Sequence, residues 1–273
     1  MLVAQLSDPH IFARGNLMEG VVDTAANLSV ALASLEEVAP TPDFVVLTGD
    51  LVNDGHPDQY DHLKEVLGRN LDSFIVVAGN HDDRAGLRAL FPQLSAVGSG
   101  DDPIDYVIDA ERDGRSLSLI VLDTTVPGLH AGALDATQLE WLDRQLGARC
   151  DREVLIVQHH PPFRSGIGFM DTYGLQGAEA EAAIVAKYPN VAAVISGHLH
   201  RPATASWGGT VAFASPSTAA QVSPSFNGET TSYTAEPGMF SLHWWTDEGV
   251  ASHVQPIGDN GRWVPEWAKV VET

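Results

Sequence analysis

Short apolar runs recur along the first two hundred residues, and each ends abruptly in polar, turn-prone residues. The runs are rich in β-branched side chains and do not alternate with polar positions, which is typical of strands buried on both faces. We therefore predict buried strands at residues 2–6, 44–47, 74–78, 155–158 and 193–196.

Helical periodicity separates these runs. From Thr24 to Val38, Leu28, Leu32 and Leu35 recur at steps of four and three residues, which favours an amphipathic helix. Two further helices are predicted at 59–67 and at 135–146, the second beginning with an aspartate that can cap free backbone amides. Because strands and helices alternate, the fold class is expected to be α/β.

The texture changes after about residue 205, where helical patterns give way to Gly, Ser, Thr and Pro between short apolar runs. Such runs are typical of β-hairpins. We therefore expect a main α/β domain at 1–205, a small β-rich appendage at 206–253, and a segment at 254–273 that returns to the main domain with Trp263 and Trp267.

Composition excludes several classes of protein. With 44% hydrophobic and 19% charged residues the chain should fold, and no apolar run approaches the ~18–20 residues of a membrane helix. Fifteen Lys and Arg against 36 Asp and Glu give a charge of −21, which would repel long nucleic acids. The start carries no secretory pattern, and the lone Cys150 is expected to pack in a reducing compartment, so a cytoplasmic location is expected.

Residues of metal-ligand type follow each of the five predicted strands. They are Asp8 and His10, then Asp50, then Asn80 with His81, then His159, then His198 and His200. Open α/β sheets form their sites at the carboxyl ends of strands, so these side chains are expected to converge. Carboxylate, imidazole and amide ligands suit a hard-to-borderline metal ion.

Each of these residues also has an ordinary structural interpretation. An aspartate after a strand is usually a helix cap or turn former, a Gly-Asn pair is usually a turn, and a single buried histidine is usually just hydrogen-bonded. That interpretation would require five coincidences at equivalent strand ends. We therefore interpret the set as a metal site.

At this point the chain resembles the calcineurin-like metallophosphoesterases. The motifs are Asp8-x-His10, Gly49-Asp50, Gly79-Asn80-His81-Asp82, His159 and Gly197-His198-x-His200. The resemblance covers residues 1 to about 200 and is strongest to the bacterial class III cyclic-nucleotide phosphodiesterases and glycerophosphodiesterases, through residues 22–28 and 159–163. It implies a four-layer α/β/β/α sandwich in which the β-rich C-terminal region acts as a cap and dimerisation region.

The resemblance also implies roles for the ligands. One ion is expected on Asp8, His10 and His200, a second on Asn80, His159 and His198, with Asp50 bridging them through one oxygen for each ion. The two divalent or trivalent ions (Fe, Mn, Zn or Co) would polarise the phosphoryl group and generate a metal-bound hydroxide that attacks it. His81 is expected to face the substrate as a proton donor, with Asp50 and Asn80 completing the catalytic set, or else to orient its neighbours.

The remaining histidines are expected to have lesser roles. His56 lies in a turn-like loop and is expected to be solvated. His130 follows Pro127-Gly128, and a surface role in that loop is expected, with a position bordering the pocket as the alternative. His160 is adjacent to a ligand, but neighbouring strand residues point to opposite faces, so only one of the pair should bind metal. The loop 163–174 contains Phe169, Met170 and Tyr173, and both a substrate lid and a plain surface loop remain open for it.

The expected function is therefore hydrolysis of small phosphodiesters, with glycerophosphodiesters first and 3′,5′-cyclic nucleotides such as cyclic AMP as the alternative. A phosphomonoesterase of the purple acid type would need a tyrosine ligand where this chain has His10. A non-catalytic scaffold would be expected to lack ligands, whereas every ligand position is filled here. The resemblance also implies a homodimer or higher oligomer, and no membrane partner is expected.

Overall fold

The first of two facing β-sheets contains the N-terminal strands. The computed structural model describes all residues except 70, 113, 227, 229, 247, 262, 264 and 266–273. In the first sheet the order is β15-β14-β1-β2-β3, where β1, β2 and β3 are parallel and β14 and β15 are antiparallel additions. The bounds are β1 Leu2–Leu6, β2 Phe44–Thr48, β3 Phe74–Val77, β14 Met239–Thr246 and β15 Gly249–Pro256.

The second sheet has the order β10-β11-β9-β7-β5-β4, and β5, β7, β9 and β11 run parallel. Its strands are β4 Tyr106–Arg112, β5 Arg115–Leu122, β7 Glu153–Gln158, β9 Val191–Ser196, β10 Ala203–Trp207 and β11 Thr210–Ala214. Short two-residue strands form two further pairs, β6 Gly132–Ala133 with β8 Leu175–Gln176 and β12 Gln221–Val222 with β13 Tyr233–Thr234.

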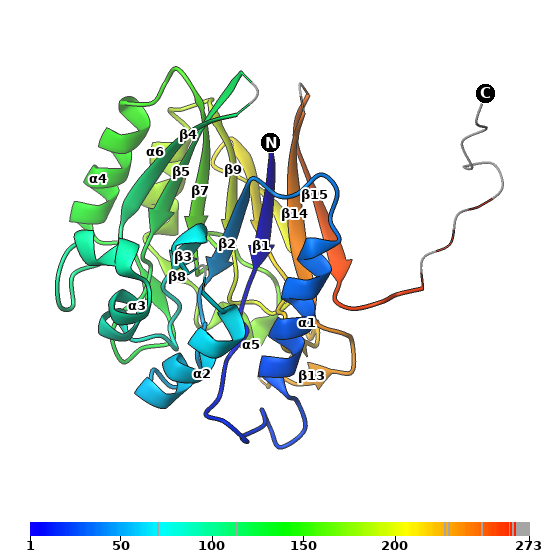
Figure 1. Ribbon diagram of the computed structural model, residues 1–273. Helices are drawn as coiled ribbons and strands as arrows, with labels where there is room; N and C mark the ends of the chain where they lie inside the picture. The colour runs from blue at the N-terminus through cyan, green and yellow to red at the C-terminus, as the bar shows by residue number, and fades with distance from the viewer. Residues whose placement is uncertain are drawn as a thin grey trace.

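Helices cover the outer face of each sheet, as Figure 1 shows with α4 and α6 on one side and α1 on the other. Three apolar clusters separate the layers: one beneath α1, α2 and α3, one between the two sheets, and one beneath α4 and α6. The result is the expected four-layer α/β/β/α sandwich. The helices are α1 Thr24–Glu36, α2 Pro57–Leu67, α3 Arg84–Leu90, α4 Ala136–Gly147, α5 Gly168–Asp171 and α6 Ala178–Val185.

The predicted strands and helices of the first two hundred residues are confirmed, with small differences at their ends. Local chemistry explains where two helices begin. The carboxylate of Asp23 accepts from the amide of Ala26 at the start of α1, and Asp135 forms a capping box with Gln138 at the start of α4. His56, expected at the surface, is exposed just before α2.

The segment 206–253 is not a separate sheet. The end of β10 and all of β11 extend the second sheet beyond β9, while β14 and β15 extend the first sheet beyond β1. A hairpin pattern reveals local pairing but not the sheet edge on which the hairpin lies, so the sequence could not show this. Only the connection between the two hairpins, which includes β12 and β13, stands apart from the sheets.

The first residues after β15, Ile257 and Gly258, lie against α1 or the cluster beneath it. Ile257 packs on the cluster beneath α1, and the amide of Gly258 donates to Ser34 Oγ at 2.8 Å. Trp263 is 79% exposed, and Trp267 lies outside the described residues. Among the described helices, none has the length and apolar character required to cross a membrane.

Candidate metal centre

The seven predicted ligands come together at one edge of the sandwich, where the carboxyl ends of β1, β2 and β3 face those of β7 and β9. Asn80 is half-buried. The other six are at most 5% exposed: Asp8, His10, Asp50, His159, His198 and His200. Polar groups buried to this degree require partners, and here their partners are largely one another.

The backbone of the site is locally unusual. Five of the predicted ligands have positive φ: Asp8 at 50°, His10 at 43°, Asp50 at 50°, His198 at 69° and His200 at 49°. Among the other described non-glycine residues only Glu19 shares this feature. The left-handed region is costly for residues with a Cβ, and strain of roughly 1–3 kcal/mol per residue gathers at functional sites. The turns after these strands therefore bend sharply enough to aim side chains two residues apart at one point.

Glycines before the ligands allow these turns to approach one another. A Cβ on Gly49, whose φ is +87°, would collide with the ring of His159, and one on Gly197 would collide with Ser7 Oγ. The glycines of the Gly49-Asp50 and Gly197-His198-x-His200 motifs are thus explained by close packing of the two sheets at the site.

The first group of ligands surrounds a single point. The Nε2 atoms of His10 and His200 lie 3.0 Å apart, and His200 Nε2 lies 3.5 Å from Asp8 Oδ1. Asp50 Oδ2 is 3.6 Å from His10 Nε2. One donor atom from each of these four residues lies within 4.8 Å of the others, as a shared ion would require.

The second group adjoins the first. Asn80 Oδ1 lies 3.1 Å from His159 Nε2 and 3.1 Å from His198 Nδ1, and His159 Nε2 is 3.4 Å from Asp50 Oδ2. Oδ2 of Asp50 therefore faces both groups. Oδ1 of Asp50 accepts the backbone N–H of His81 at 2.9 Å, and the expected arrangement of one Asp50 oxygen for each ion stays a prediction.

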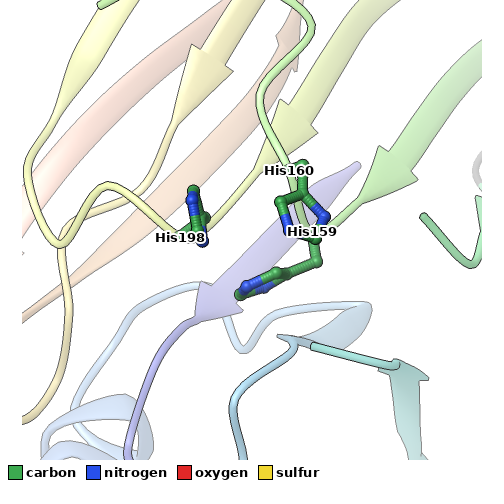
Figure 2. Close-up of side chains that lie close together, drawn as sticks. All are labelled: His159, His160 and His198. Atoms are coloured by element: carbon green, nitrogen blue, oxygen red, sulfur yellow. The ribbon is translucent and has the colours of Figure 1, made fainter. Parts of the chain in front are cut away.

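His160 lies beside this second group, as Figure 2 shows for His159, His160 and His198 at the ends of β7 and β9. Its nitrogens are nevertheless engaged elsewhere, with Nδ1 2.8 Å from Thr124 Oγ1 and Nε2 3.0 Å from the carbonyl oxygen of His130. Burial lowers the pKa of His160 to about 3, so the ring is neutral. The geometry favours His159 over His160 as the ligand.

Hydrogen bonds to backbone oxygens orient two of the imidazoles. His159 Nδ1 donates to the carbonyl of Thr48 at 2.8 Å, and His200 Nδ1 donates to that of Ala220 at 3.1 Å. Each bond fixes the tautomer and leaves Nε2 free to coordinate a metal. His198 Nε2 and His10 Nδ1 are buried without a hydrogen-bond partner among the described residues.

The electrostatics of the cluster suit cations. Burial raises the pKa of Asp50, but His159 and His10 outweigh it and hold that pKa well below its usual range. Burial lowers the pKa of His159, but Asp50 and Asp8 outweigh it and raise the pKa to about 9, so the metal-free ring attracts a proton whose place a bound ion would take. Burial keeps the pKa of His10 well below its usual value, which leaves a neutral ring with a lone pair. These Asp, His and Asn donors are able to hold two borderline metal ions.

His81 and Asp82 follow Asn80 but differ in what they contact. His81 Nδ1 donates to the carbonyl of Asn53 at 2.6 Å, and its ring lies edge-on to that of His10 with centroids 4.7 Å apart. The carboxylate of Asp82 accepts the amides of Leu51, Val52 and Gly79. Asp82 therefore holds the loops after β2 and β3 together, while His81 borders the open side of the site.

A cavity of about 390 Å³ opens above the ligands. Phe169, Met170 and Tyr173 line one side, so the loop 163–174 does border the site, and Val222, Thr231 and Tyr233 of the β12–β13 connection line another. A second cavity of about 310 Å³ shares Asn80 and His81 with the first and extends past Asp83 and Thr125. A larger one of about 900 Å³, near Pro162 and Trp207, contains none of the predicted ligands.

His130 is at the surface as expected, and it also borders the cavity, which was the alternative. Its ring lines the 390 Å³ cavity, and its Nδ1 lies 3.2 Å from Asn80 Nδ2. The loop containing it crosses from β5 to the site, a path that the sequence pattern does not reveal. Tyr233 was missed, and an aromatic residue in a Thr-rich turn was the available signal.

The comparison with protein families agrees with this geometry. The model of the calcineurin-like phosphoesterases matches residues 1–202. The chain belongs to this family. Membership of the family makes the chain a metal-dependent phosphoesterase. The candidate site lies at the ends of strands within the matched residues.

Relatives of this phosphoesterase carry two kinds of name. A protein of Arcobacter nitrofigilis named "Probable glycerophosphodiester phosphodiesterase" is 32% identical over 261 residues, covering 94% of each chain. A 3′,5′-cyclic adenosine monophosphate phosphodiesterase of Escherichia coli is 28% identical over 266 residues, covering 97% of this chain and 93% of the relative. A cAMP/cGMP dual specificity phosphodiesterase of Mycobacterium tuberculosis is 33% identical over 263 residues, covering 94% and 80%.

Solved structures share the fold at low identity. A dimetal phosphatase from Danio rerio superposes with a TM-score of 0.64 at 19% identity, covering 94% of this chain and 99% of its own. GAP50, described as the anchor in the inner membrane complex of Plasmodium, superposes with a TM-score of 0.63 at 14% identity, covering 96% and 90%. These likenesses support the sandwich architecture.

Proposed function

We propose that this phosphoesterase is a binuclear-metal-dependent phosphodiesterase of small molecules, with glycerophosphodiesters as the preferred substrates. The carrying observation is that Asp50 Oδ2 lies between the two ligand groups, 3.6 Å from His10 Nε2 and 3.4 Å from His159 Nε2. Asp8, His10 and His200 would hold one ion, Asn80, His159 and His198 the other, and Asp50 both.

The two ions, when bound, supply Lewis-acid polarisation of the phosphoryl group and a water molecule that is nucleophilic near neutral pH. The side chains of the site contribute the rest. His81 is fixed through Nδ1–H to the carbonyl of Asn53, so it is the imidazolium form that can donate a proton from Nε2 to the departing alkoxide oxygen and become neutral. Asp50 and Asn80 orient the centre, and the buried sheet edge excludes bulk water from it.

Two cavities that share Asn80 and His81 favour an open-chain diester. Such a substrate has two separate ester arms on one phosphorus atom, and each arm can enter one cavity. The relative from Arcobacter nitrofigilis, matched over 94% of both chains, carries a glycerophosphodiesterase name, which supports the same choice.

A specific observation supports the alternative, a 3′,5′-cyclic-nucleotide phosphodiesterase. Phe169, Tyr173 and Tyr233 present aromatic faces to the 390 Å³ cavity, where a nucleobase could stack. The relatives from Escherichia coli and Mycobacterium tuberculosis carry names of this kind.

Turnover of glycerophosphoethanolamine and of cyclic AMP by Mn²⁺-loaded protein tests the proposal. We expect a higher kcat/KM for glycerophosphoethanolamine, and loss of both activities in Asp50→Ala. The matched control is Asp58→Ala, an exposed acid in the first turn of α2 that should retain activity. Absence of hydrolysis of both compounds by the wild type, or full activity in Asp50→Ala, would refute the assignment.

Assembly and cellular location remain part of the proposal. We infer a homodimer, or a higher homo-oligomer, formed through the C-terminal strands, where Trp244 of β14 is 37% exposed. Light scattering of the full chain at micromolar concentration should give twice the 29.2 kDa mass, whereas a monomer would contradict the inference. Cys150, which was expected to pack, is instead exposed after the end of α4. A cytoplasmic location is proposed because this one cysteine has no partner for an internal disulfide, and fractionation of the source cells would test it.

A further inference from the structure

We propose that His130 is a positioning residue for the metal centre, because its Nδ1 fixes the orientation of the Asn80 amide, and that its other ring nitrogen donates to the substrate. This inference rests on the proposed two-metal function. It assigns a task to a loop residue that belongs to none of the motifs.

The argument begins with the shape of an amide. The two ends of the Asn80 side chain are nearly identical in size, so packing alone does not decide which end faces the ions. Only the oxygen can coordinate a cation, since the amide nitrogen carries two protons and offers no lone pair. A partner that accepts a hydrogen bond on the nitrogen side is therefore required to select the useful orientation.

His130 supplies that acceptor. Asn80 Nδ2 lies 3.2 Å from His130 Nδ1, while Asn80 Oδ1 lies 3.1 Å from both His159 Nε2 and His198 Nδ1. In the reverse orientation the NH₂ group would enter the ligand cluster and the oxygen would face the lone pair of His130. Both contacts would then be unfavourable for metal binding.

The backbone that carries His130 is itself anchored. The ring of His160 donates from Nε2 to the carbonyl oxygen of His130 at 3.0 Å, and its Nδ1 lies 2.8 Å from Thr124 Oγ1. His160 is fully buried, and Gly132 allows its approach, because a Cβ there would collide with the His160 ring. The exposed loop that contains His130 is thus held in place by a hydrogen bond from the buried His160.

The second nitrogen of His130 is left for the substrate. Since Nδ1 accepts from Asn80, the ring proton resides on Nε2, for which no partner is found in the described part of the structure. The ring lies 5.3 Å from that of His81 and 5.6 Å from that of Tyr173, measured between centroids, and lines the 390 Å³ cavity. Nε2–H can therefore donate to a phosphoryl oxygen beside His81.

Two variants separate the two tasks. In His130→Asn, Oδ1 replaces Nδ1 as the acceptor for Asn80, but no group replaces Nε2–H. In His130→Ala both are removed. Leu129→Ala is the matched control on the same loop, because Leu129 is 55% exposed and does not line the cavity.

Calorimetric titration of metal-free protein with Mn²⁺ measures the first task without substrate. We expect the second ion to bind His130→Ala about 10–100-fold more weakly than wild type, as for other groups that orient ligands. Affinity in His130→Asn should return to near the wild-type value, and Leu129→Ala should match the wild type. Unchanged second-ion affinity in His130→Ala would overturn the positioning role.

Steady-state kinetics at saturating Mn²⁺ measures the second task. We expect His130→Asn to bind two ions and still lose about tenfold or more in kcat/KM, the order of one general-acid or oxyanion contact. Full kcat/KM in that variant would overturn the substrate contact. Failure of the wild type to bind two ions would instead refute the proposed function, so the two results are distinguishable.

Discussion

Gly79 lies so close to Asp50 that a Cβ at position 79 would collide with the backbone nitrogen and the carboxylate of Asp50. The loops after β2 and β3 are therefore in direct contact behind the shared ligand. We predict that Gly79→Ala abolishes turnover and weakens Mn²⁺ binding, because the Asp50 turn has to move. Turnover assays and calorimetry on the purified variant check this.

Gly147→Ala is the control for that substitution. It lies at the end of α4, where a new Cβ would meet only the hydroxyl of Tyr188 at 3.4 Å. Alanine there should leave activity unchanged. Wild-type metal affinity in Gly79→Ala would show that the contact between the loops is dispensable.

Metal removal should lower the thermal stability as well as the activity. Asp8 and Asp50 are buried in one ligand group, and burial raises the pKa of Asp8, so the Asp8 carboxylate is poorly accommodated without a cation. Binding of ions to the folded state alone adds about 4 kcal/mol at a thousandfold excess over Kd. Scanning calorimetry with EDTA and with Mn²⁺ should show a lower Tm in EDTA, and Asp50→Ala should show little difference between the two.

Glu181 predicts a pH dependence of stability away from the metal centre. It is fully buried on α6, and burial raises its pKa to about 8 from an ordinary 4.5. A raised carboxyl pKa contributes stability that is complete below about pH 4.5 and is lost as the pH rises towards 8. Glu181→Gln, which stays neutral, should therefore gain stability relative to wild type over this interval, on the order of 4 kcal/mol at pH 8.

Urea unfolding at pH 5, 6.5 and 8 measures this difference. Glu179→Gln is the matched control, since Glu179 lies exposed on the same helix and should give a constant difference from wild type. A stability difference for Glu181→Gln that does not grow with pH would contradict the prediction.

Tyr173 should distinguish the two proposed substrate classes. Its ring lines the 390 Å³ cavity beside Phe169, with centroids 5.3 Å apart. If a nucleobase stacks there, Tyr173→Ala should raise KM for cyclic AMP by about tenfold, the order of one base–aromatic contact, and should change KM for glycerophosphoethanolamine less. Tyr173→Phe retains the ring and should behave as wild type. Equal effects of Tyr173→Ala on both substrates would exclude a base-specific contact.

Much of the fold was predictable because strands buried on both faces of a parallel sheet have continuous apolar sequences. The hairpin of β4 and β5 was not anticipated. In β4 the charged residues Asp109, Glu111 and Arg112 fall on a half-exposed edge strand, where neither an apolar run nor strict alternation survives. The short helices α3 and α6 also lack enough turns for a clear period.

The candidate site was also predictable only in part. The identity of the converging residues could be predicted because they directly follow predicted strands. Their distances and hydrogen bonds could not, because these depend on tertiary contacts. That Asp50 Oδ1 accepts from His81, and that His130 reaches Asn80, follow from how loops fifty residues apart meet in space. The ligand roles given to the seven residues remain predictions for metal-bound protein.

The division of the ligands between the sheets has a mechanical consequence. Asp8, His10, Asp50 and Asn80 follow strands of one sheet, whereas His159, His198 and His200 follow strands of the other. Ions held by both groups would act as cross-links at one end of the sandwich, much as a disulfide staples two segments. Among the described residues no second cluster of metal ligands joins the sheets at the opposite end, so amide hydrogen exchange in metal-free protein should quicken first along the facing strand ends next to Asp50.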